Sequence, residues 1–230
     1  MLYRNNGVLA GMRDLPLDIQ YRGQLEIWTG EIQQLAQFDR HTLVAGTRIQ
    51  DGDFMTRDLL TGDTRLSPRF GDTTGQGVFH KAAILEDFRR ISFYAYETWH
   101  LMDQLALTAG LAWKDLRYPA NFRNPLLDAG TEHTSRLLPK AALVWSPVNA
   151  LTIRGMYGQL LGGVSLDESY RLEPVQLAGF SQAFRTVIPE SIVGSISAHQ
   201  LDLGGTAVDV KLPSRTYLGF LGTVTDFDVD

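Results

Sequence analysis

The side chains that could carry chemistry in this 230-residue sequence are scattered rather than grouped. The 5 histidines form no His-x-His or His-Glu-x-x-His pair, the spacings that bring two imidazoles onto one metal ion. The sequence contains no cysteine, which excludes thiolate catalysis, zinc–thiolate sites and structural disulfides. We therefore expect neither a metal site nor a cofactor.

One glycine-containing stretch, Gly162-Gly-Val-Ser-Leu-Asp167, has some features of a phosphate loop or a nucleophile turn. It lacks the lysine of a Walker loop and the second glycine of a nucleophile elbow. Ser165 is also far in sequence from His133 and His199, so no serine pairs with a histidine base. Acidic loop residues such as Glu173 are interpreted as solvated. We expect no catalytic residues and do not predict an enzyme.

Two sets of residues are candidates for contact with a ligand. Lys114, Lys140 and Arg154 alternate with apolar residues along their segments, so each is expected on a polar strand face. The second set lies in a long polar stretch, and exposed aromatic side chains beside arginines are typical of recognition surfaces. Its members are Tyr170, Arg171, Phe180, Phe184 and Arg185. The alternatives are ordinary solvated polar residues for the first set and packing within a long loop for the second.

The elements that carry these residues are predicted to be β-strands. Apolar residues alternate with polar or small residues along 105–117 and 151–159, as on a strand with one apolar face. Short segments rich in Asp, Asn and Pro favour tight turns before these and two other strands. The predicted hairpins are 24–37 with 42–50, 89–100 with 105–117, 140–146 with 151–159, and 200–211 with 216–225. The sequence thus predicts an all-β fold of about eight antiparallel, up-and-down strands in four hairpins.

Long polar connections alternate with the tight turns. They cover about 51–87, 118–138 and 160–199, lengths that are uncommon in compact soluble domains. Because they alternate with tight turns, all long loops are expected at one end of the strands. Lipid offers no hydrogen bonds, so a spanning sheet must pair its own backbone groups and keep one face apolar. The pattern is typical of a transmembrane β-barrel.

On this interpretation, Lys114, Lys140 and Arg154 face the lumen. Trp99 and Trp145 come just before tight turns and are expected in the aromatic girdle at the membrane interface. The alternative is that both tryptophans are core residues of a soluble β-sandwich.

The charge and the first residues restrict the partners. A net charge of −5 argues against nucleic acid, which requires clustered Lys and Arg. No apolar run approaches the roughly 18 residues of a membrane helix. The start, Met1-Leu-Tyr-Arg-Asn-Asn-Gly7, lacks the basic and apolar regions of a signal peptide.

Two of the predicted hairpins resemble those of TonB-dependent receptors. The stretch Ile91–Trp113 resembles a hairpin in which an aromatic strand ending in Trp turns at a polar step into Leu-x-Leu-x-x-Gly-Leu. The stretch Leu138–Gly158 is similar to Pro-Lys-x-x-x-x-Trp-x-Pro followed by Leu-Thr-x-Arg-x-x-Tyr-Gly. The clearest resemblance covers residues 88–225. Within it, the irregular segment 165–190 lies where such receptors place an external loop.

The resemblance implies one partial outer-membrane barrel domain over 1–230, surrounded by lipid and taking up a small ligand. The family has about 22 strands and an N-terminal plug, whereas this sequence has about eight strands and no plug-like or TonB-contacting segment. It also ends at Phe227-Asp-Val-Asp230 without a terminal aromatic residue. We therefore expect a piece of a longer protein of the cell outer membrane, with TonB contacted through an earlier part.

Two other functions remain open on the sequence alone. One is the export pore of a protein that carries helical repeats elsewhere, although no such repeat is seen here. The other is a soluble β-sandwich that binds sugars, in which the apolar strand faces would pack against a second sheet.

Overall fold

The computed structural model describes residues 2–5, 17–62, 77–120, 130–161, 171–182, 198 and 200–228. Over these residues the chain is all-β and antiparallel, as predicted. None of their segments is a helix long and apolar enough to cross a membrane.

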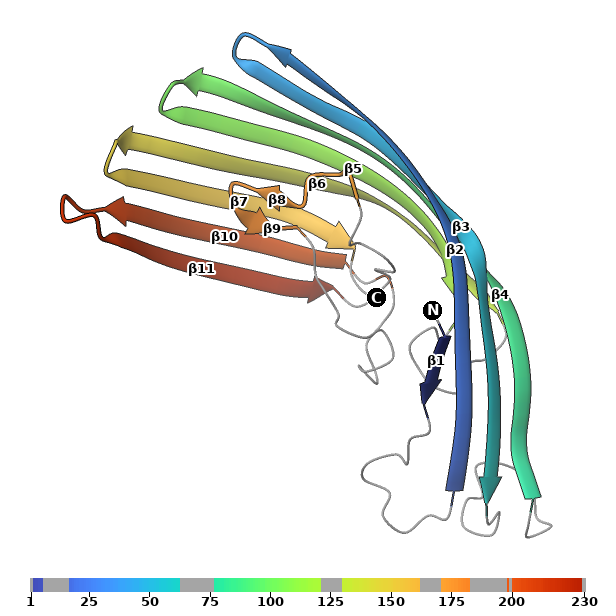
Figure 1. The fold of residues 1–230 in the computed structure, drawn as a ribbon. Coiled ribbons are helices and arrows are strands. Elements are labelled where there is room, and N and C mark those ends of the chain that lie inside the picture. Colours follow the sequence, from blue (N-terminus) through green and yellow to red (C-terminus); the bar gives the residue numbers. More distant parts are fainter. Residues whose placement is uncertain are drawn as a thin grey trace. The chain divides into compact units, whose positions relative to one another are not determined.

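The eight long strands form the four predicted hairpins. They are β2 (Leu17–Phe38) with β3 (His41–Gly62), β4 (Gly77–Met102) with β5 (Leu105–Pro119), β6 (Thr131–Val148) with β7 (Leu151–Leu161), and β10 (Gln200–Lys211) with β11 (Tyr217–Asp228). A short strand that the sequence did not predict, β1 (Leu2–Asn5), pairs antiparallel with β2. The order in the sheet follows the order in the chain, from β1 through β7 to β10 and β11 (Figure 1).

The turns within the hairpins are as short as expected. Asp39 and Arg40 are the only residues between β2 and β3, and Asp39 has a positive φ of 30°, which Asp tolerates better than most residues. The turn between β10 and β11 is closed by hydrogen bonds from Leu212 N to Thr216 O (2.9 Å) and from Arg215 N to Leu212 O (3.1 Å). These turns determine which residues face each other across each hairpin.

The long connections are shorter than the sequence predicted. Residues 51–62 and 77–87 were expected in a loop but belong to β3 and β4, and residues 118–119 and 131–138 belong to β5 and β6. The prediction was wrong there because charged residues such as Asp51, Asp53 and Asp87 are depleted in strands. A strand depends on backbone pairing, however, and polar side chains are compatible with pairing where a face meets water.

The chain divides into two compact units. The first consists of Met1–Trp28, Gln50–Arg89 and Arg117–His133, and the second of Thr29–Ile49, Arg90–Leu116 and Thr134–Asp230. In the first unit Phe88 is fully buried, and the Glu86 carboxylate accepts a 2.8 Å hydrogen bond from Gly130 N. That residues 1–230 form one partial barrel domain without a plug stays a prediction.

In the second unit the two faces of the sheet differ. One face, called here the covered face, carries a buried cluster that includes Tyr94, Tyr96, Leu138 and Met156. The opposite face, called the open face, carries exposed apolar side chains, because successive residues of a strand point to opposite sides. The open-face residues include Phe93, Leu111, Leu143, Tyr157, Phe220 and Val224.

Candidate functional site

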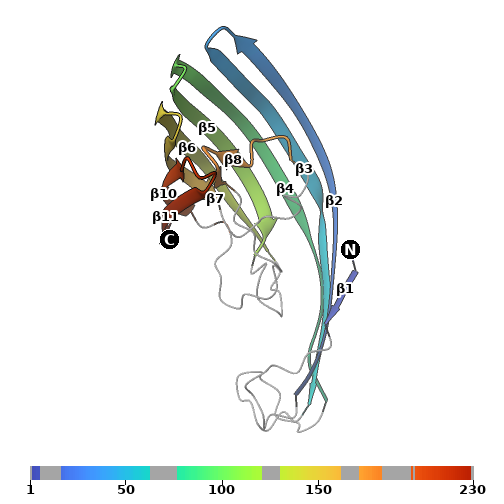
Figure 2. The ribbon, with the colours of Figure 1, turned by 60° about the vertical axis from the view of Figure 1, so that its left-hand side comes forward.

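The segment 171–182 lies against the covered face (Figure 2). It contains a small hairpin of β8 (Gln176–Leu177) and β9 (Phe180–Ser181), which forms a two-stranded sheet of its own. The turn residues Ala178 and Gly179 have positive φ values of 49° and 84°, a conformation that glycine adopts without strain. A hydrogen bond of 2.8 Å from Gln182 N to Val175 O closes the base of the hairpin.

A buried carboxylate joins this segment to the strands. Glu173 Oε1 accepts a 2.6 Å hydrogen bond from the Tyr96 hydroxyl and lies 3.2 Å from Lys140 Nζ. Glu173 Oε2 lies 3.8 Å from Lys114 Nζ, and Lys140 Nζ also donates to the Tyr96 hydroxyl at 2.7 Å. All four side chains are buried. They are called here the carboxylate cluster.

The surroundings of Glu173 favour its ionised form. Burial alone would raise the pKa of this carboxyl, because a charge is less stable away from water. The positive charges of Lys114 and Lys140 and the hydrogen bond from Tyr96 outweigh burial and lower the pKa of Glu173 well below its ordinary value. The cluster is therefore a carboxylate held by two cations and a hydroxyl.

The start of the segment is attached to strand β2, and one of the β2 side chains that hold it also contacts β3 and β4. Glu173 N donates to Glu31 Oε1 at 3.0 Å, and Gln33 Nε2 donates to the carbonyl of Leu172 at 2.5 Å. Glu31 also accepts a hydrogen bond of 3.2 Å from the Tyr94 hydroxyl and lies 3.9 Å from Arg48 Nε. The start of the segment is thus linked, through Glu31, to several neighbouring strands.

The tip of the hairpin is held by Arg154 of β7. Its Nη1 donates to the carbonyl of Ala178 at 3.0 Å, and its Nε donates to Asp209 Oδ2 at 2.8 Å. The guanidinium lies 5.8 Å from the centre of the Phe180 ring, within the range of a cation–π interaction. Phe180 in turn packs over Gly205, where a Cβ would come within 2.6 Å of the ring. Glycine is therefore needed at position 205 for this contact.

The structure brings together the three cations that the sequence singled out. Lys114, Lys140 and Arg154 all lie on the covered face and all contact the segment 171–182. Of the loop candidates, Arg171 and Phe180 belong to this segment. Tyr170, Phe184 and Arg185 lie outside the described residues. A lumenal position for the cations and ligand contact by the loop residues stay predictions.

Sequence reasoning missed the partners of these cations. Glu173 was interpreted as solvated, and this was wrong because the residue is buried. Asp209 was grouped with Glu173 as a solvated acidic residue, and Tyr96 was not selected as a site residue at all. The available signal was the alternation of β4, in which Tyr94 and Tyr96 fall on the face opposite Phe93. It gave no indication that a distant segment would cover that face.

Trp99 and Trp145 lie near the tight-turn ends of β4 and β6, and both are partly exposed. The Trp99 ring stacks on His41 with centroids 5.6 Å apart, and His41 Nδ1 lies 2.7 Å from Glu97 Oε1. An aromatic ring beside polar groups suits a membrane interface. The girdle assignment itself stays a prediction.

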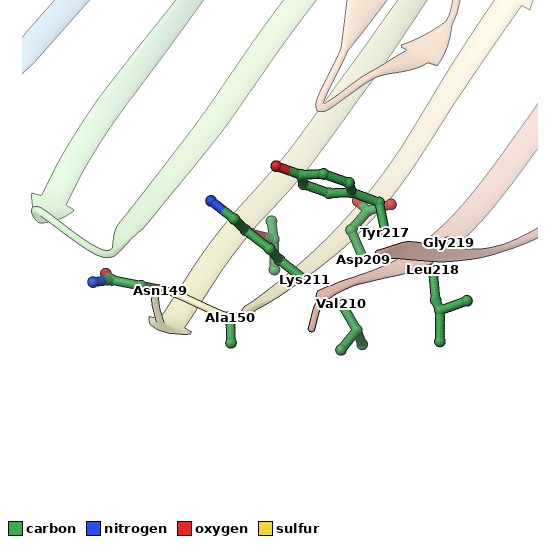
Figure 3. Close-up of a pocket in the computed structure, with 9 residues that line it drawn as sticks. Asn149, Ala150, Asp209, Val210, Lys211, Tyr217, Leu218 and Gly219 are labelled. Atoms are coloured by element: carbon green, nitrogen blue, oxygen red, sulfur yellow. The ribbon is translucent and has the colours of Figure 1, made fainter. Parts of the chain in front are cut away.

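A pocket of about 390 Å³ lies at the tight-turn end of β7, β10 and β11. Figure 3 shows that Asp209, Lys211 and Tyr217 project to one side of the sheet there, while Val210 and Leu218 project to the other. Lys211 Nζ lies 5.8 Å from the centre of the Tyr217 ring. The pocket includes none of the ligand-contact residues predicted from the sequence.

The described residues hold no group of three or more His, Cys, Asp or Glu side chains placed to bind a metal ion. Ser165 and His199, considered above as a catalytic pair, lie outside the described residues. His133 is exposed in β6.

Comparison with known proteins identifies a similar family. The sequence matches the family model "TonB dependent receptor-like, beta-barrel" over residues 2–192. No match is found among curated proteins. Among solved structures, the chain is similar to "Copper transporter OprC", with a TM-score of 0.52 and 11% sequence identity. The match covers 91% of this chain but only 32% of that chain.

Proposed function

The chain belongs to the TonB dependent receptor-like β-barrel family, and from this membership we propose that it is part of an outer-membrane barrel through which a small ligand is taken up. The membrane lipid is the partner of the open face. TonB contacts another part of the protein, outside these strands. The proposal assigns binding and passage to the chain and no catalysed reaction.

The observation that carries this proposal is that, in the second unit, the exposed face of the sheet is apolar whereas the buried face carries charged side chains. This is the reverse of a water-soluble protein. The open face is apolar and exposed, with Leu137 55% and Phe93 52% exposed on strands that are paired on both sides. The covered face carries the buried charges of Lys114, Lys140 and Glu173. A water-soluble protein rarely exposes so continuous an apolar surface, whereas a barrel wall places such residues against lipid and its polar residues inside.

The covered face is accordingly the wall of the lumen, and the cations Lys114, Lys140 and Arg154 lie along the path of the ligand. Arg171 and Phe180 would meet the ligand from the segment 171–182. Tyr170 precedes that segment in the sequence, and Phe184 and Arg185 follow it. We propose these three residues as further contacts from the same loop.

Both alternatives suggested by the sequence have less support. A β-sandwich needs a second large sheet over the apolar faces, and the described residues contain one nine-stranded sheet and one two-stranded hairpin. An export pore would share the barrel wall, so only the direction of transport distinguishes it. Family membership favours uptake.

The test uses two neighbouring positions of β11 in the full-length protein inserted in an outer membrane. Val224 lies on the open face, and Thr223 pairs with Gly205 on the opposite side. Single substitutions Val224→Cys and Thr223→Cys would carry a nitroxide spin label. We expect the label at 224 to be relaxed by oxygen dissolved in lipid and the label at 223 by a water-soluble nickel complex. Equal access of the nickel complex to both labels would contradict the proposal.

A further inference from the structure

The carboxylate cluster has the composition of a binding site for a carboxylate group. Two ammonium groups and one hydroxyl converge on a single pair of oxygens, with Tyr96 at 2.6 Å, Lys140 at 3.2 Å and Lys114 at 3.8 Å. Each of the three groups comes from a strand of the main sheet, β4, β5 or β6. The carboxylate is the one member that comes from outside the sheet.

The two lysines of the site are poorly hydrated while the segment 171–182 covers them. Lys114 is 8% exposed and Lys140 is 4% exposed. Two like charges so close together and so poorly hydrated require a compensating negative charge. If Glu173 leaves, either water or another anion must take its place.

The segment that carries Glu173 can leave without damage to the wall. Its hairpin β8–β9 belongs to a separate two-stranded sheet, so its departure breaks no backbone pairing of the nine-stranded sheet. The groups of the sheet that hold it are side chains, notably Gln33, Tyr96, Lys140 and Arg154. Such contacts can be exchanged for contacts with a ligand.

We propose that Lys114, Lys140 and the Tyr96 hydroxyl bind a carboxylate of the transported ligand, and that Glu173 occupies this site as a built-in competitor until the ligand displaces it. This inference rests on the proposed function, since it places the site on the path through the barrel. It assigns the ligand to the class of small carboxylic acids.

Citrate is a suitable probe for the site, and binding would be measured by titration calorimetry on the full-length protein in detergent. Because a competitor lowers apparent affinity by the fraction of sites it fills, Glu173→Gln should bind citrate at least about tenfold more tightly than the wild type. Gly205→Ala should act in the same direction, since its Cβ would conflict with Phe180 and loosen the segment while leaving the cluster unchanged. If Glu173→Gln does not fold, Gly205→Ala still tests the inference.

Further variants separate the site from general charge effects. Adding Lys114→Gln and Lys140→Gln to either tight-binding variant should abolish citrate binding. Lys211→Gln, which removes a lysine far from the cluster in the sheet, should leave citrate binding unchanged. The inference would be overturned if tight citrate binding survived the loss of both cluster lysines. It would also be overturned if neither Glu173→Gln nor Gly205→Ala gained affinity for citrate.

Movement of the segment gives an independent measurement. A nitroxide at Val175→Cys, an exposed position of the segment, should become more mobile as citrate is added to the wild-type protein. Glucose, or sodium chloride at equal ionic strength, should have no such effect. The label at position 224 is measured alongside. If the label at 224 contacts lipid but the label at 175 does not respond to citrate, this inference alone is rejected. If the label at 224 does not contact lipid, the proposed function is rejected.

Discussion

Tyr96 and Glu173 are 77 residues apart in sequence, yet the Tyr96 hydroxyl donates a 2.6 Å hydrogen bond to the Glu173 carboxylate on the covered face. This bond links a strand of the main sheet to the segment 171–182, whose hairpin forms a sheet of its own. Together with the contacts of Lys114 and Lys140, it attaches the segment 171–182 to the sheet.

Replacing Tyr96 by Phe removes the hydroxyl and should loosen the segment. A hydrogen bond to a charged partner contributes about 1.5–3 kcal/mol, so amide hydrogen exchange in 171–182 should become about 10- to 100-fold faster. Tyr157→Phe is the matched control, because the Tyr157 hydroxyl is exposed and lies 3.4 Å from Asp202. Equal exchange rates in the two variants would show that the Tyr96 bond does not hold the segment.

Acid should release the segment through protonation of Glu173. The pKa of Glu173 is lowered in the docked state, because Lys114, Lys140 and Tyr96 outweigh the effect of burial. In the released state it returns toward its ordinary value of 4.5. The stabilisation is therefore complete above that value and is lost as pH falls below it toward the lowered pKa.

This pH dependence can be followed by the mobility of a nitroxide at Val175→Cys between pH 7 and pH 3. The label should stay immobile down to about pH 4.5 and become mobile below it. In the Glu173→Gln background the same titration should be flat over this range. A transition of equal size in that variant would assign the acid sensitivity to another group.

A methyl group at position 205 should weaken docking because it occupies the space of the Phe180 ring. The Cβ of Gly205→Ala would lie 2.6 Å from Phe180 Cε1, and such overpacking costs about 1–3 kcal/mol. Gly204→Ala is a close control, since nothing lies within 4 Å of its added Cβ. Proteolysis of the segment should be faster in Gly205→Ala and unchanged in Gly204→Ala.

A charge on the open face should disturb membrane insertion. Leu143 is exposed on that face in β6, and an arginine facing lipid near the membrane midplane costs about 2–4 kcal/mol. We expect Leu143→Arg to lower the urea midpoint for unfolding from lipid vesicles. Leu212→Arg, placed in the turn before β11, should leave the midpoint unchanged. A β-sheet that does not meet lipid would respond little to either substitution.

The sequence predicted the hairpins because their information is local. Alternation along 105–117 and 151–159 and the turn residues at 101–104 and 147–150 lie within a few positions of one another, and they determine strand pairing. The ends of the strands were less predictable. Residues such as Asp51 and Asp87 are polar, and the sequence does not say whether polar residues continue a paired strand or begin a loop.

The candidate site was predicted only in part for a different reason. Lys114, Lys140 and Arg154 could be selected because they alternate with apolar residues in their own strands and therefore fall on the polar face. Glu173 could not, since its burial depends on where the segment 171–182 lies in space. A carboxylate in a polar stretch has the same local pattern whether it meets water or two lysines.

The agreement between chain order and sheet order has a consequence for the evolution of such walls. In the part of the chain that the structure describes, each long strand of the main sheet pairs with the long strands that come before and after it in the chain; only the short strands β8 and β9 between β7 and β10 are left out of this order. Duplication or deletion of a whole hairpin would therefore join two strands of the right polarity and preserve the alternation of faces. The circumference of the wall can change in steps of two strands by a single genetic event, while the residues on the remaining strands keep their partners.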